Sequence, residues 1–197
     1  MQKNESLRGF EITTYVWCTI LALLAFSSHF LFVILSPLIF LDKLSLSLTD
    51  YGLVMLYYGA AYIAGGSLAS FSTERITTIN QVKLGLIVIC TGGIVMLTLN
   101  SLAGMSVQTV IGCVIITTCG VCLTRPAATT LAMDAVPSRA GAAAAGINTA
   151  VFIGGGIVSF FLGIYSEAAD ILMPLALITM GSTGLIITKL CLPTFRP

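Results

Sequence analysis

The residue most suited to binding chemistry is Arg125, which lies inside a long apolar run and is followed at once by Pro126. Thr118, Cys122, Arg125 and Thr129 follow one another at steps of four, three and four residues, so a helix places them on one face. A charged side chain inside a membrane helix is costly and normally faces the bundle interior or a water-filled cavity. This face predicts a binding surface for an anionic or polar ligand. The alternative is an arginine that reaches the lipid headgroups.

The depth of Arg125 favours the buried position. It precedes Asp134, which we expect at the membrane boundary, by nine residues. At about 1.5 Å per residue this is roughly 13 Å, close to the middle of a hydrocarbon core of about 30 Å. Every Asp and Glu falls at a boundary or in a loop. The counter-charge of Arg125 must therefore come from a substrate, from backbone carbonyls or from another polypeptide segment.

Three further polar features are candidates for the same site. His29, the single histidine, could relay protons or could be a hydrogen-bonded core residue. Asn148 could join two helices or line a cavity. An aromatic stripe at helical spacing could be packing or an aromatic cavity wall. The stripe consists of Tyr51, Met55, Tyr58 and Tyr62.

The sequence offers no catalytic or metal-binding pattern. Neither H-E-x-x-H nor G-x-S-x-G occurs, and no pair of carboxylates lies within the apolar runs. Cys119 and Cys122 form a C-x-x-C, but they lie on an apolar helix without a neighbouring histidine and are better explained as small packing residues. We therefore expect no enzyme, no cofactor and no metal site.

Composition places these residues on membrane helices. Hydrophobic residues make up 57% of the 197-residue chain and charged residues 9%, far below the roughly 25% typical of soluble domains. Long charge-free runs alternate with short polar segments, and the longest holds two spans around a turn at Asn100–Gln108. The sequence predicts an all-α membrane protein of six transmembrane helices. The expected spans are residues 12–41, 51–72, 82–99, 107–133, 139–164 and 168–190.

The distribution of charge predicts the orientation. With an even number of spans, the leader (1–11), two loops and the tail (191–197) lie on one side, and seven of the nine basic residues lie in them or at the adjoining ends of the spans. Because short cytoplasmic loops are rich in Lys and Arg, both termini are expected to be cytoplasmic. Pro37 and Pro126 interrupt the first and fourth spans at comparable positions, which suggests two inverted repeats of three helices. The net charge of +1 gives no reason to expect a nucleic-acid partner.

The chain resembles the C-terminal six-helix half of a major facilitator superfamily transporter, most of all the bicyclomycin-resistance type of drug/proton antiporter. Besides the proline in the fourth span, three stretches carry this resemblance across essentially the whole chain. They are FVILSP (Phe32–Pro37), LSLTDYG (Leu46–Gly52) and, most specific, VPSRAGAAAAG (Val136–Gly146). In that family the first and fourth helices of each half line a central cavity, which agrees with Arg125 and His29 as site residues.

The resemblance also has gaps. Of the gating motif expected after the second span, only the glycines and Glu74–Arg75 remain, and the N-terminal half with its proton-coupling carboxylate is absent. The chain is expected to be half of an inner-membrane transporter that exports drugs or small organic molecules in exchange for protons, together with a second six-helix unit from a separate chain or a homodimer. The alternatives are a non-transporting membrane subunit and a truncated or degenerate transporter. A split gene, a truncation or a true half-transporter would each explain the length.

Overall fold

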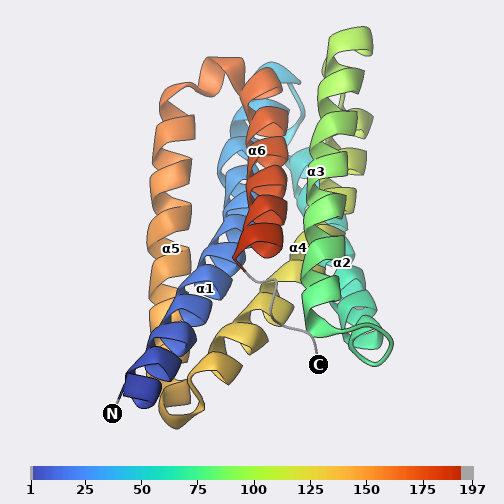
Figure 1. Cartoon of the computed structure of the whole chain (residues 1–197). Coiled ribbons are helices and arrows are strands. Elements are labelled where there is room, and N and C mark those ends of the chain that lie inside the picture. Colours follow the sequence, from blue (N-terminus) through green and yellow to red (C-terminus); the bar gives the residue numbers. More distant parts are fainter. Residues whose placement is uncertain (1, 192–197) are drawn as a thin grey trace.

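The computed structural model describes residues 2–191, and they form a bundle of six long helices joined by short connections (Figure 1). All six are long and apolar enough to cross a membrane, and no strand occurs in the described part of the chain. This confirms the predicted fold class, an all-α membrane protein with six spans. The helices are α1 (Gln2–Pro37), α2 (Leu48–Thr73), α3 (Thr78–Ala103), α4 (Val107–Ala135), α5 (Ala140–Ile164) and α6 (Ala169–Leu190).

Several helices extend beyond the expected spans, most clearly at the start of α1 and between α3 and α4. The residues predicted as the leader are helical from Gln2 and continue directly into the first span. The turn expected at Asn100–Gln108 shrinks to three residues, 104–106, since Gly104 ends α3 with a φ of +76° and Ser106 caps α4 by accepting a hydrogen bond from the Thr109 N–H. Of the predicted tail, residues 192–197 lie outside the described residues.

The two prolines act differently from the predicted helix interruptions. The α-helix ends at Pro37, and the chain continues directly as a π-helix, Leu38–Lys43. The helix therefore changes its hydrogen-bond pattern at Pro37 but is not interrupted. Pro126 lies inside α4, which runs through it without a break. Because proline has no backbone N–H, Pro126 cannot donate the hydrogen bond that the Cys122 carbonyl, one turn earlier, would otherwise accept.

Burial follows the predicted repeat of three helices. The buried share of the spanning stretch is 61% in α1 and 56% in α4, 28% in α2 and 22% in α5, and 39% in both α3 and α6. Each helix of the first three thus has a buried share similar to that of its counterpart in the second three. The first and fourth helices form the centre, and α2 and α5 are the most exposed.

Glycines set the closest helix crossings. A Cβ at Gly85 in α3 would lie 2.5 Å from the carbonyl oxygen of Gly120 in α4, so only glycine permits this approach. On the other side of the bundle, Gly146 of α5 lies against the Tyr15 hydroxyl, which donates a hydrogen bond of 3.0 Å to the Ala143 carbonyl. These contacts fix α3 against α4, and α5 against α1.

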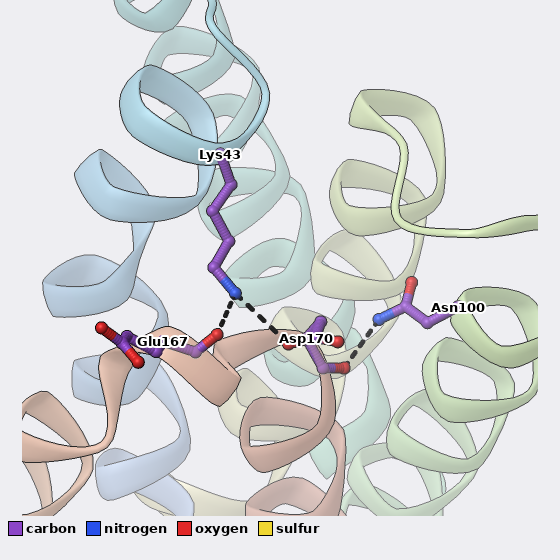
Figure 2. Close-up of polar contacts among 4 residues, drawn as sticks. All are labelled: Lys43, Asn100, Glu167 and Asp170. Carbon is purple, nitrogen blue, oxygen red and sulfur yellow. Dashed lines mark hydrogen bonds and ion pairs between the residues drawn. The ribbon is translucent and has the colours of Figure 1, made fainter.

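A polar cluster joins three helices at the end of the bundle opposite the start of α1 (Figure 2). Lys43, the last residue of the π-helix, donates to the Glu167 carbonyl and forms an ion pair of 3.3 Å with Asp170. Asn100 of α3 donates to the Asp170 carbonyl at 2.9 Å. The cluster connects the ends of α1, α3 and α6.

Candidate functional site

A cavity of about 460 Å³ opens beside the middle of α4. Its walls come from α2, α4 and α5, and α1 lies behind it. Arg125 and Thr129 of the predicted polar face belong to this wall. The full lining is Tyr62, Gly66, Val121, Cys122, Arg125, Pro126, Thr129, Thr130 and Asn148.

The guanidinium of Arg125 lies over an aromatic ring. Its central carbon is 3.9 Å from the centroid of the Phe26 ring on α1, which is the geometry of a cation–π contact. Phe26 is held edge-on by Phe30, with ring centroids 4.7 Å apart, and by Phe152 of α5 at 5.9 Å. Three helices therefore cooperate to hold the arginine in place.

The donors of Arg125 have no acceptor among the described residues. Within residues 2–191, the ion pair that forms joins Lys43 and Asp170 at the end of the bundle and does not involve Arg125. The Arg125 guanidinium also takes part in none of the hydrogen bonds found in these residues. A cation–π contact compensates a desolvated cation by about 2 kcal/mol but leaves the planar N–H donors unsatisfied. The arrangement presents a half-buried cation to a cavity that contains no carboxylate.

His29 and the tyrosines of α2 form a layer behind the cavity. The Tyr58 hydroxyl and Nδ1 of His29 share a hydrogen bond, and the two rings stack with centroids 5.5 Å apart. The centroid of the Tyr62 ring lies 5.3 Å from that of His29. The Phe26 ring lies 5.4 Å from the His29 ring and also lies under the Arg125 guanidinium. The layer therefore connects a group that can hold a proton to the arginine.

The structure divides the predicted residues into two groups. Arg125, Thr129, Tyr62 and Asn148 reach the cavity wall. His29 and the buried pair of Tyr58 and Thr118, 9% and 3% exposed, lie behind it. The aromatic stripe of α2 is therefore divided between the core and the cavity. Tyr51 packs against the core, and its hydroxyl shares a hydrogen bond of 3.0 Å with the Ser36 hydroxyl. Of the four stripe residues, Tyr62 is the one that lines the cavity.

Sequence reasoning missed Phe26. A turn-by-turn reading of α1 could have found it, because Phe26 lies three residues before His29 and hence on the same face. The polar face of α4 also includes Cys122, whose thiol donates to the Tyr62 carbonyl at 3.5 Å and which is only 5% exposed. Its side chain joins α2 to α4 and also belongs to the cavity lining.

Comparison with known families agrees with this architecture. The family model described as Major Facilitator Superfamily matches residues 3–159, which is most of the chain. The chain belongs to the major facilitator superfamily. Members of this superfamily are multi-pass membrane transporters and not enzymes. At the level of the family, the protein is therefore a membrane transport protein. The matched range covers α1 to α4 and most of α5, whereas α6 follows it. No curated protein matched the chain.

Within the superfamily fold, the cavity occupies the side where α1 and α4 meet the exposed helices α2 and α5. A cation at the middle of an otherwise apolar bundle is the feature of this cavity that can discriminate between ligands. It would bind a carboxylate, phosphate or sulfonate through parallel N–H donors.

Proposed function

We propose that the chain is one half of a secondary-active transporter of the inner membrane that exports small amphiphilic anions in exchange for protons. Arg125 carries the proposal, because its guanidinium faces a cavity of about 460 Å³ without an acceptor among the described residues. A planar cation held on an aromatic ring is preorganised for bidentate recognition of an anionic group. Export and proton exchange rest on the resemblance to the bicyclomycin-resistance type.

The apolar part of the substrate would lie against the aromatic wall. Tyr62 provides the ring surface in the cavity lining, and Thr129 and Asn148 provide hydrogen-bonding groups. His29, bonded to Tyr58, would carry the exchanged proton, since imidazole is the side chain that titrates nearest to physiological pH. An aromatic or alkyl carboxylate fits this set better than a cationic drug does.

A second six-helix unit would complete the transporter. The spanning stretches of α2 and α5 are the least buried, and both contribute residues to the cavity. Alternating access requires a second wall that moves against the first. We propose that this wall comes from a separate chain or a second copy, and that residues 2–11 and the α2–α3 and α4–α5 connections face the cytoplasm.

Arg125 variants test the site directly. In the purified full chain, 2-naphthoate should bind about 10–100-fold more tightly than the neutral 2-naphthamide, because a hydrogen bond to a charged partner contributes about 1.5–3 kcal/mol. Arg125→Leu should abolish this preference without loss of folding, and Arg125→Lys should retain only part of it because the planar donor pair is lost. Lys189→Leu, which removes an exposed cation at the end of α6, is the matched control.

Transport provides the second arm of the test. Efflux of 2-naphthoate driven by an imposed proton gradient should require both the chain and a co-expressed N-terminal six-helix unit, and should disappear with Arg125→Leu. Equal binding of naphthoate and naphthamide would refute the anion site. Selective binding without flux in any pairing would favour the non-transporting subunit.

A further inference from the structure

A second cavity adjoins the first along the groove between α2 and α4. It also measures about 460 Å³ and extends toward the α2–α3 connection. The two cavities share the wall made by Gly66, Cys122, Pro126 and Thr130. The lining that belongs to the second cavity alone comes from three helices, and it is Ala69, Ser70, Thr73, Thr78, Gln81 and Ala127.

Gln81 is the unusual residue of this second cavity. Its side chain is 1% exposed, and its Nε2 donates to the Ala69 carbonyl at 3.1 Å. Its Oε1 is buried and has no hydrogen-bond partner. The amide cannot be reversed, because that would place Oε1 against the Ala69 carbonyl oxygen, and neither oxygen can donate. The cavity is therefore bordered by a buried acceptor that lacks a donor.

A backbone carbonyl next to the shared wall also lacks its usual donor. Pro126 has no N–H, so the carbonyl of Cys122, one turn earlier in α4, has no donor at the usual position. Both residues line both cavities. The hydroxyl groups of Ser70 and Thr78 take part in none of the hydrogen bonds recorded for the described residues, and they can also accept. The second cavity is thus rich in acceptors and has no charged side chain in its lining.

We infer that this second cavity is a binding subsite for a neutral hydrogen-bond donor, a hydroxyl or amide N–H group, on the same ligand whose anionic end binds Arg125. An unpaired buried oxygen favours any donor that can reach it. An ammonium group is disfavoured, because no carboxylate lines the subsite and Arg125 lies in the adjoining cavity. This inference rests on the proposed anion site and specifies the substrate class as anions with a polar, donor-bearing tail.

Binding of matched acids to the purified full chain tests the subsite. Medium-chain ω-hydroxyalkanoates are compared with alkanoates of the same length that end in methyl, because the two series differ only in the donor. At the best length, the hydroxy acid should bind about 3–10-fold more tightly, the range of one neutral hydrogen bond. Gln81→Leu should remove this preference and leave the affinity for the plain alkanoate unchanged.

Two further variants keep the test decisive. Gln108→Leu, at an exposed position at the start of α4, is the matched control and should retain the preference. Ser70→Ala, a mild change at an exposed cavity residue, should reduce the preference even if Gln81→Leu proves unstable in a thermal-unfolding check. Hydroxy acids that bind no better than alkanoates in the unsubstituted protein, or ω-aminoalkanoates that bind more tightly than hydroxy acids, would overturn the subsite. Loss of alkanoate affinity relative to the alkanamide would instead indicate that the Arg125 site fails.

Discussion

Substitution of Gly120 by alanine tests the helix crossing that positions Arg125 most directly. A Cβ at this position would lie 2.6 Å from the Gly85 carbonyl oxygen and 2.9 Å from the Ile89 backbone nitrogen. Backbone atoms cannot rotate away as a side chain can. To reach an ordinary contact of 3.4 Å, α3 and α4 would have to separate by roughly 0.8 Å at the crossing, the difference between 3.4 and 2.6 Å.

The size of the effect follows from two opposing terms. Overpacking of this kind costs about 1–3 kcal/mol. Replacing glycine by alanine inside a helix contributes up to about 1 kcal/mol of stability. Gly112 of the same helix isolates the second term, because a Cβ there would meet nothing within 4 Å. Gly120→Ala should therefore be less stable than Gly112→Ala by about 1–3 kcal/mol, or roughly 3–10 °C in melting temperature for a chain of this length.

The assay is thermal unfolding of the detergent-purified chain. The measured quantity is the fraction of protein that remains monodisperse after heating to each temperature. Gly85→Ala should lower the midpoint at least as much as Gly120→Ala, since its Cβ would lie 2.2 Å from the Thr124 hydroxyl and 2.5 Å from the Gly120 carbonyl oxygen. Equal midpoints for Gly112→Ala and Gly120→Ala would refute the inference that backbone contact holds α3 and α4 together.

Two further predictions concern the ends of the bundle. Lys43→Met should lower the unfolding midpoint only slightly, because the ion pair with Asp170 is partly exposed and such pairs contribute about 0–1 kcal/mol; a midpoint drop of more than about 5 °C would show that this estimate is too small. A periplasm-active reporter should be silent when fused after residue 191 and active when inserted at 44–47, because the basic residues concentrate on the predicted cytoplasmic side; the reverse pattern would overturn the proposed orientation.

The site could be predicted only in part from the sequence. Arg125, Thr129, Tyr62 and Asn148 were identifiable because helical spacing and the cost of polar groups in lipid mark them individually. Their common cavity was not predictable from spacing, because Asn148 and Tyr62 come from helices whose relative rotation no local pattern specifies. Two contacts were unpredictable for the same reason, because each joins residues that are far apart in the chain. They are the contact of Arg125 with Phe26 and the ion pair of Lys43 with Asp170.

The sequence by itself determined the membrane class, the number of helices and the position of the cation within the fourth span. These follow from charge-free length and from the rise of a helix, which are local quantities. Tertiary structure alone decided that Pro126 leaves α4 continuous, that Tyr58 and Thr118 lie behind the cavity, and that Gln81 keeps an oxygen without a donor. The physical reason is that these outcomes depend on how closely neighbouring helices approach. Glycine contacts such as Gly85 with Gly120 set that distance, and they act between segments that are remote in the sequence.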